Sequence, residues 1–245
     1  MSKVFRETFT VPFDMVDVKQ EIVLSQFISY CLGVSGRQSE SIGRSDMVVF
    51  DTYGLVWVVT DYQLDISRLP RYKEVITIET QAVAYDRFMC QRDFRIFDGK
   101  GEKLLTITCY FVLIDFASRK LAQVPDELIG PYDSEKVRKL PKIAKLLAMD
   151  HPTDTDYRIR YFDIDMNGHV NNGVYLDWFY DVLGYDFLLA HRPQTMQLKY
   201  IKEISPGGMV TSRFERTGLT SRHDIVVDGV IHAQASITWE ARDDN

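Results

Sequence analysis

The chain has 245 residues, a formal net charge of −6, 45% hydrophobic and 26% charged residues, which is the composition of an ordinary globular protein. The acidic balance argues against nucleic acid as the main partner, because phosphate binding needs a dominant basic surface. No window offers the roughly 18 uncharged apolar residues of a membrane span, and residues 1–8 lack the apolar stretch of a secretory signal. We therefore expect a compact protein of the cytoplasm without a membrane span.

The first half begins with a strand-like run over residues 9–17 that leads into a helix over residues 20–35. This helix is apolar nearly all round, so we expect it to be deeply buried. Strands are predicted next over residues 55–65, 75–85, 88–97 and 104–115. The dipeptide Asp98-Gly99 marks a hairpin turn between the last two.

The middle of the chain, residues 131–152, reads as a charged connector with a short helical pattern. It carries a basic run, which is typical of solvated surface, at Lys136, Arg138, Lys139, Lys142 and Lys145. A second strand-like run over residues 157–165 and a second helix follow. The predicted strands of this half cover residues 195–204, 209–217, 223–227 and 230–240. The dipeptide Asp228-Gly229 marks the hairpin turn between the last two.

The two halves repeat each other. From Asp17 onward they align at a constant offset of 148 residues, which pairs Ile22 with Val170 and Gly36 with Gly184. One buried helix followed by an antiparallel sheet that could wrap it, repeated once, predicts an α+β fold with two similar halves. The boundary between them is expected within residues 130–155.

The densest polar cluster is D-I-D-M-N-G-H-V-N-N at residues 163–172. If the segment is extended, alternate side chains share one face, so Asp163, Asp165, Asn167 and His169 would converge on one site. A polar turn that only caps the following helix is the simpler alternative, because Asn and Asp favour both turns and helix N-caps.

Calcium is a second alternative for this cluster, since Gly168 and Val170 occupy the positions that an EF-hand loop requires. Position 12 of such a loop needs a bidentate Glu, and the chain has Val174 there. Residues 157–162 also alternate like a strand where the loop needs a helix. We therefore predict that no metal binds.

The cluster resembles a signature of the acyl-acyl carrier protein thioesterases, a plant and bacterial family built from two hotdog folds in tandem. The signature D-x-N-x-H-V-N-N is present at residues 165–172, and the associated L-x-Y-x-x-E motif is present at residues 198–203. The resemblance covers the whole chain. It implies an N-terminal hotdog for acyl-chain binding over residues 1–130, a linker over 131–153 and a catalytic C-terminal hotdog over 154–245.

The activity that this resemblance implies is hydrolysis of fatty acyl-acyl carrier protein to free fatty acid, which terminates fatty acid synthesis. Plant members often have a cysteine directly after the glutamate, and Ile204 stands there in this chain. The second half contains no cysteine, which leaves hydrolysis by an activated water. An acyl-coenzyme A thioesterase and a non-catalytic acyl-binding hotdog protein remain the alternatives.

Thioester hydrolysis needs a positioned water, a base and donors for the oxyanion. Glu203 is the first choice for the base, and His169 could share this role or bind the thioester region. Asn167 could position the water or the carbonyl, and Asp165 could orient these side chains. Asn171 and Asn172 are expected to bind substrate, because they begin a helix whose N-terminal turn offers N–H groups to an oxyanion.

The first half lacks this set of residues. The alignment places Lys19 opposite Asn167 and Glu21 opposite His169, and it places Ser67 opposite Glu203. The resemblance implies that the first half holds the acyl chain. The far end of its pocket could be closed by Met15, Phe27, Trp57, Phe88 and Met89, although apolar strand and helix residues are more often plain core.

No cofactor is expected, since the chain contains no dinucleotide fingerprint, phosphate loop or serine-nucleophile motif. The partner is expected to be acyl carrier protein, an acidic protein in such systems. The linker lysines or the pair Arg158 and Arg160 could supply a positive docking face. Whether the chain also forms a homodimer stays open.

Overall fold

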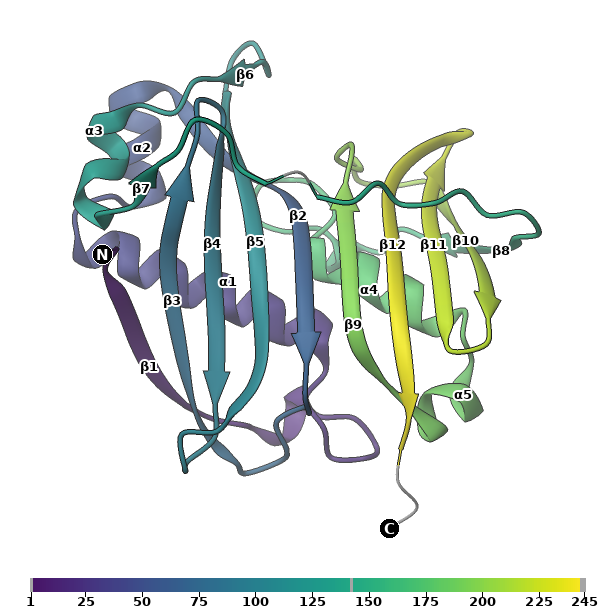
Figure 1. Cartoon of the computed structure of the whole chain (residues 1–245). Coiled ribbons are helices and arrows are strands. Elements are labelled where there is room, and N and C mark those ends of the chain that lie inside the picture. Colours follow the sequence, from purple (N-terminus) through teal and green to yellow (C-terminus); the bar gives the residue numbers. More distant parts are fainter. Residues whose placement is uncertain (1, 142, 243–245) are drawn as a thin grey trace.

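One antiparallel sheet runs through the computed structural model, which describes residues 2–141 and 143–242 (Figure 1). The first half contributes strands in the order β1 (Val4–Thr10), β3 (Val75–Tyr85), β4 (Met89–Phe97), β5 (Lys103–Asp115) and β2 (Leu55–Ile66). The second half continues with β9 (His191–Tyr200), β12 (Val230–Ala241), β11 (Thr220–Val227), β10 (Met209–Thr217) and β8 (Thr153–Arg158). Read outward from the centre, both halves have the same strand order, which confirms the two tandem hotdog folds.

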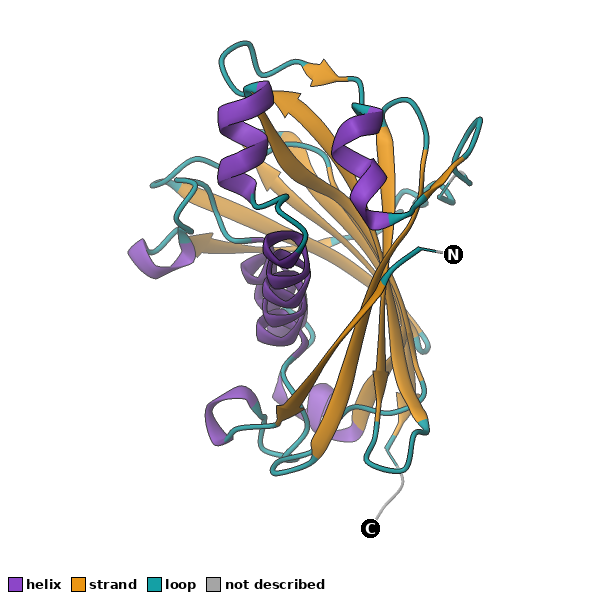
Figure 2. Ribbon diagram, turned by 90° about the vertical axis from the view of Figure 1, so that its left-hand side faces the viewer, coloured by secondary structure: helices purple, strands orange, loops and turns teal. Residues whose placement is uncertain are grey.

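Two helices pack against the same face of this sheet, α1 (Leu24–Ser41) in the first half and α4 (Asn172–Asp181) in the second (Figure 2). Each follows a single turn of 3-10 helix, η1 (Phe13–Met15) or η3 (Tyr161–Asp163). The remaining elements are short, namely α2 (Asp46–Tyr53), β6 (Leu121–Ala122), α3 (Asp126–Ile129), η2 (Gly130–Tyr132), β7 (Glu135–Lys136) and α5 (Tyr185–Ala190).

The repeat at an offset of 148 residues is confirmed by the hydrogen bonding around these turns. An isolated bridge joins Val16 to Ile22 in the first half, and the equivalent bridge joins Ile164 to Val170 in the second. The equivalence ends with α4, because α1 continues for two more turns. The pairing of Gly36 with Gly184 is therefore wrong: the former lies inside α1, and the latter precedes α5 with a φ of 80°.

The two halves join where β2 pairs with β9. Gln63 lies opposite Gln197, with Tyr62 opposite Leu198 and Leu64 opposite Met196, so the two strands are related by an approximate two-fold axis. Beyond the helices the two halves therefore align at an offset of 134 residues. Because the sheet is continuous through this pair, the fold holds both halves in a fixed relation at its centre.

The same offset corrects the counterpart of Glu203. The N–H of Ile22 donates to Pro70 O, and the N–H of Val170 donates to Ile204 O, each at an N···O distance of 2.9–3.0 Å. Pro70 and Ile204 are thus equivalent, so Leu69 is the counterpart of Glu203. The alignment with Ser67 was wrong because it used Pro206, which lies in a turn with no equivalent geometry.

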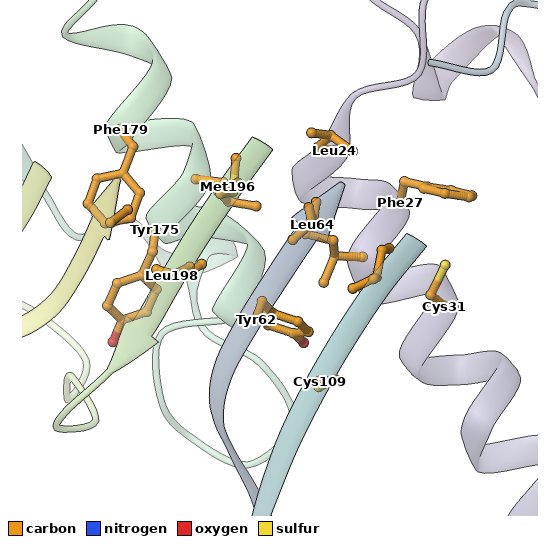
Figure 3. Packing of buried hydrophobic residues seen from close by; sticks show 14 of the residues in the cluster. Leu24, Phe27, Cys31, Tyr62, Leu64, Cys109, Tyr175, Phe179, Met196 and Leu198 are labelled. Atoms are coloured by element: carbon orange, nitrogen blue, oxygen red, sulfur yellow. The ribbon is translucent and has the colours of Figure 1, made fainter. Parts of the chain in front are cut away.

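The core lies between the sheet and the two helices (Figure 3). One continuous cluster of fully buried side chains spans both halves, and its members include Phe27 from α1, Tyr62 from β2, Phe179 from α4 and Leu198 from β9. The helices themselves contact each other, and a Cβ atom at Gly173 would lie 2.5 Å from the carbonyl oxygen of Ser25. Only glycine allows this approach, which places the start of α4 beside α1.

Several predicted boundaries were wrong for identifiable reasons. The runs over residues 9–17 and 157–165 are not strands throughout, because the chain turns through η1 and η3 within them. The predicted strand over residues 195–204 ends at Tyr200, since the N–H groups of Ile201 and Lys202 both donate to His232 O and the ladder stops there. Glu203 therefore lies beyond the strand.

The connector is not helical in its described residues after η2. It runs extended across the sheet face opposite α1 (Figure 1), with Leu140 buried against Ala84 and Tyr110. Packing against the sheet and the break at Pro141 outweigh the local helical pattern. Lys142 of the predicted basic run lies outside the described residues.

Candidate active site

The polar segment after η3 folds into a tight turn organised by Asp165. The N–H of Asp165 donates to His169 O at 2.9 Å, and the Asp165 side chain accepts from the N–H of Asn167 at 2.8 Å. Gly168 completes the turn with a φ of 82°, a conformation that favours glycine. The segment is thus a turn and not an extended strand, so its four polar side chains do not share one face.

Asp163 does not line the site, because its side chain is buried within the turn. Its carboxylate is 1% exposed and forms an ion pair with Arg160 at 2.8 Å. The same carboxylate accepts from the Arg160 N–H at 2.7 Å and so caps the 3-10 turn. The convergence predicted for Asp163 was therefore wrong, and an important ligand of the calcium alternative is already occupied.

Glu203 and His169 do come together. The Glu203 Oε2 atom lies 3.4 Å from His169 Nε2, although 34 positions separate the two residues in sequence. The same oxygen is paired with the guanidinium of Arg119, which reaches across from the turn after β5 in the first half. The Glu203 Oε1 atom makes no hydrogen bond to the described residues, so it can accept one from a water or a substrate.

Arg119 is the residue of this site that sequence reasoning did not place there. Its backbone φ is 57°, and its side chain is 42% exposed beside a Glu203 side chain that is 39% exposed. The pair is thus open to solvent.

The start of α4 brings Asn171 and Asn172 to the same place. The Asn171 side chain is the N-cap of α4, and its Oδ1 accepts from the N–H of Gly173 at 2.8 Å. The Ser29 hydroxyl lies 3.5 Å from the same oxygen, and the Asn172 carbonyl accepts from the Tyr200 hydroxyl at 2.6 Å. The cap thus uses the Gly173 N–H, one of the groups that were expected to donate to an oxyanion. The side-chain amide of Asn167 makes no hydrogen bond to the described residues.

A cavity of about 690 Å³ opens at these residues and extends into the first half. Asp165, Asn167, His169, Asn171, Asn172 and Glu203 all line it, together with Arg119. Its wall follows one stripe of α1, through Ser29, Leu32, Gly36 and Ser39. Of the five residues proposed to close its far end, Trp57 lines the cavity, whereas Phe27 is part of the closed core.

The titration behaviour of the neighbouring side chains limits the chemistry. Burial, followed by the nearby carboxylates of Glu203 and Asp165, raises the pKa of Tyr175, so this tyrosine stays neutral. Burial also raises the pKa of Cys90, which lines the cavity, to about 12, and raises those of Cys31 and Cys109 further. No described thiol is therefore poised as a nucleophilic thiolate at neutral pH.

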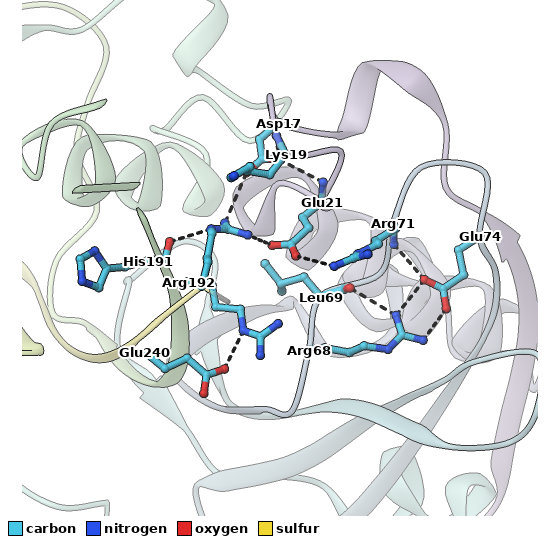
Figure 4. A network of polar contacts seen from close by, with 11 residues as sticks. Asp17, Lys19, Glu21, Arg68, Leu69, Arg71, Glu74, His191, Arg192 and Glu240 are labelled. Atoms are coloured by element: carbon cyan, nitrogen blue, oxygen red, sulfur yellow. Dashed lines mark hydrogen bonds and ion pairs between the residues drawn. The ribbon is translucent and has the colours of Figure 1, made fainter. Parts of the chain in front are cut away.

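The corresponding place in the first half holds a buried ion-pair network (Figure 4). Glu21, the counterpart of His169, is 3% exposed and paired with Arg242 from the end of the chain. Arg71 approaches the other Glu21 oxygen to 3.8 Å, and Asp17 lies 3.8 Å from Arg242. This position therefore holds a structural ion pair in place of the candidate catalytic groups of the second half.

Within residues 2–141 and 143–242, no group of three or more His, Cys, Asp or Glu side chains has the geometry of a metal site. Over the same residues, none of the helices combines the length and the hydropathy needed to cross a membrane.

Family profiles match nearly the whole chain. The profile of the acyl-ACP thioesterase N-terminal domain matches residues 2–132, and that of the acyl-ACP thioesterase C-terminal domain matches residues 147–241. An oleoyl-acyl carrier protein thioesterase from Coriandrum sativum is 26% identical over 98% of this chain and 70% of its own length. A dodecanoyl-[acyl-carrier-protein] hydrolase from Umbellularia californica is 26% identical over 94% of this chain and 64% of its own length. The chain thus spans about two thirds of the length of these relatives.

Solved structures agree with this match. A Lactobacillus plantarum protein assigned as an oleoyl thioesterase superposes with a TM-score of 0.92 at 31% identity, over 99% of this chain and 98% of that chain. The 12:0-ACP thioesterase from Umbellularia californica superposes with a TM-score of 0.84 at 23% identity, over 98% of each chain, which shows a shared fold.

Proposed function

The chain belongs to the acyl-ACP thioesterase family, and on this premise we propose that it hydrolyses fatty acyl-acyl carrier protein to free fatty acid and the carrier thiol. The observation that carries the proposal is the meeting of Glu203, His169 and Asn167 at the mouth of a cavity that leads into the first half. A cavity of this kind can hold an acyl chain while its thioester lies at the mouth.

In the proposed reaction, a water hydrogen-bonded to Glu203 Oε1 attacks the thioester carbonyl carbon and gives its proton to this carboxylate. The C=O electron pair moves to oxygen, and the Asn167 amide donates a hydrogen bond to the resulting oxyanion. The intermediate then collapses, the C–S bond breaks, and the leaving sulfur takes the proton back from Glu203. The base is thereby regenerated, and the products are the fatty acid and the thiol.

The other polar residues support this step. His169 lies 3.4 Å from Glu203 Oε2 and can donate to the carboxylate or share the base role. Asp165 holds the turn that presents Asn167, through the N–H of that residue. Asn171 and Asn172 fix the start of α4 at the cavity wall, where the thioester would lie.

We further propose that residues 1–130 hold the acyl chain, residues 131–153 link the halves, and residues 154–245 supply most of the catalytic groups. The support is the lining of the cavity, most of which comes from the first half, whereas the candidate catalytic side chains come mainly from the second. Arg119 is the exception, because it comes from the first half. Both halves of one chain therefore contribute side chains to the proposed site.

Acyl carrier protein would dock against positive charge around the mouth. Arg160 and Lys136, two of the expected docking residues, are engaged with Asp163 and Asp126. Lys202 lines the cavity and Lys120 follows Arg119, and both are exposed and form no ion pair with described residues. Reversing both charges should raise KM for the protein-bound substrate with little change in kcat. An unchanged KM would reject this docking face.

The proposed activity is tested by mixing the purified chain with long-chain acyl-acyl carrier protein and a thiol-reactive dye, and by quantifying the free fatty acid. We expect thiol and acid to appear in equal amounts, with a higher kcat/KM than on the same acyl group carried by coenzyme A. A preference for the coenzyme A ester would identify the chain as an acyl-CoA thioesterase. Binding without release of either product would identify a non-catalytic acyl-binding protein.

A further inference from the structure

A buried arginine faces the cavity without an acidic partner. Arg92 on β4 is 8% exposed, and its Nη1 donates to Gln38 Oε1 at 2.5 Å and to Thr80 Oγ1 at 3.0 Å. No carboxylate oxygen of the described residues lies within 4 Å of this guanidinium. Burial lowers the pKa of Arg92, but an arginine remains charged at neutral pH.

Arg92 lies at the end of the cavity away from Glu203. Ser29 contacts Asn171 near the mouth, and Gln38, nine positions further along α1, contacts Arg92. A helix rises about 1.5 Å per residue, so these two levels are about 14 Å apart along α1. The acyl chain would therefore run from the thioester toward this guanidinium.

The surroundings of Arg92 make this end of the cavity polar. The Tyr132 ring lies 5.5 Å from the Arg92 Cζ atom, and the Tyr132 hydroxyl donates to Ser39 Oγ at 2.7 Å. Asp46, an exposed residue, also lines the cavity without forming an ion pair with Arg92. Partial desolvation of its carboxyl group, followed by the nearby charge of Glu40, raises its pKa. Arg92, Tyr132, Ser39 and Asp46 are called the polar floor below.

A plain hydrocarbon end would fit this floor poorly. The Nε and Nη2 groups of Arg92 make no hydrogen bond to described residues, and a methyl group arriving there would exclude water without replacing it as a partner. Leaving donors of a buried charged group unpaired is costly. An oxygen at the same place would accept from them, and a carboxylate would match the guanidinium fork with two parallel hydrogen bonds.

We propose that the pocket selects acyl chains that carry an acceptor oxygen, as a hydroxyl or a carboxylate, at the end distal to the thioester. This inference rests on the proposed function for the thioester end and adds the substrate class. Arg92 is the residue that sets the preference, through the Nε and Nη2 donors that Gln38 and Thr80 leave free.

The test compares acyl-acyl carrier proteins of matched chain length that end in a methyl, a hydroxyl or a carboxyl group. At the best length, the wild-type chain should hydrolyse an oxygenated substrate with a kcat/KM at least about ten-fold above that of the methyl-terminated one, as expected for one charge-assisted hydrogen bond. A larger gain for the carboxyl than for the hydroxyl substrate would identify bidentate recognition.

Arg92→Met should reverse this order, because it replaces the guanidinium with an apolar side chain of similar length. Arg92→Lys should keep part of the carboxyl preference, since the charge stays and the fork is lost. Arg95→Met is the matched control: Arg95 lies on the same strand, binds Glu79 and Gln81, and does not line the cavity. Its order of substrates should equal that of the wild type.

Calorimetric binding of the corresponding free acids to the wild-type chain separates this inference from the proposed function. If no thioester is hydrolysed, the proposed function fails, and tighter binding of oxygenated acids would still support the polar floor. If the methyl-terminated acids and thioesters are preferred at every length by the wild-type chain, the inference is wrong. That comparison needs no variant, so it stands even if Arg92→Met does not fold.

Discussion

Arg119 and Glu203 form an ion pair that joins the two halves of the chain at the mouth of the cavity. The pair has a structural counterpart, in which Arg242 reaches Glu21. Arg119 follows β5 and Arg242 follows β12, the last long strand of each half. Each half therefore sends an arginine to the polar turn region of the other, and only the first of these pairs lies at an open cavity.

Arg119→Met should lower kcat about ten-fold, because the Glu203 carboxylate loses the contact that fixes its orientation for the water. The unfolding free energy should fall by less than about 1 kcal/mol, since the pair is exposed. Steady-state kinetics and urea denaturation measure the two effects. Arg6→Met, which removes an exposed pair with Glu79, is the control and should leave kcat unchanged. Full turnover in Arg119→Met would show that the pair does not position Glu203.

Glu21→Gln should destabilise the fold by about 3 kcal/mol or more, because it leaves the charge of Arg242 without its main partner in a buried place. Activity measured well below the unfolding temperature should persist. Glu21 thus contributes to stability although it has no proposed catalytic role. The control is Lys136→Met, which breaks an exposed pair with Asp126 and should cost less than about 1 kcal/mol. Equal losses in the two variants would contradict the structural role of Glu21.

Gly173→Ala should destabilise the chain by about 1–3 kcal/mol, because the added Cβ would lie 2.5 Å from Ser25 O and force α1 and α4 apart. The same shift should lower kcat, since Asn171 and the turn before α4 move with the helix. Gly33→Ala is the matched control within α1, where the new atom meets only the end of the Arg37 side chain at 3.4 Å. It should stabilise the chain by about 0.5–1 kcal/mol. A neutral Gly173→Ala would mean that the helices tolerate a wider separation.

His223 should make the stability depend on pH. Burial lowers its pKa to about 3, whereas an unfolded histidine titrates near 6.5. The unfolded chain therefore binds the proton more readily, so this residue's contribution is complete above pH 6.5 and is lost as the pH falls toward 3. The loss approaches about 1.4 kcal/mol per pH unit below pH 6.

The check is the unfolding free energy of wild type and His223→Gln between pH 7 and 4.5. The difference between the two unfolding free energies should shrink as the pH falls. In the wild type, protonation of His223 in the unfolded chain stabilises that state, and the variant lacks this histidine. Parallel curves for His223→Gln and wild type would show that this histidine does not titrate as inferred.

Much of the architecture could be predicted from the sequence, because it follows from local periodicity and from the repeat. Strand β10 lies over the predicted residues, and the repeat correctly aligned Ile22 with Val170. The conformation of the polar turn before α4 was harder to predict from the sequence. An extended segment predicts Asp163 at the site, whereas its carboxylate caps η3 and binds Arg160.

Long-range partners could not be predicted in the same way. Arg119 lies 84 positions from Glu203 and belongs to no motif, so nothing local places it at the site. Arg92 did leave a signal. Phe94 and Ile96 alternate with polar residues on β4, and Arg92 falls in the same inward register as these apolar side chains. A charge at an inward-facing position of a strand is a sign of a buried polar site.

The most direct test of the account is the turnover of Glu203→Gln on acyl-acyl carrier protein. This variant keeps the side chain's size but cannot accept the proton of the water, so kcat should fall at least about 100-fold while the unfolding free energy changes little. Glu240→Gln, which weakens a comparable pair with Arg192 far from the cavity, should retain full turnover. Undiminished hydrolysis by Glu203→Gln would contradict the assignment of Glu203 as the base.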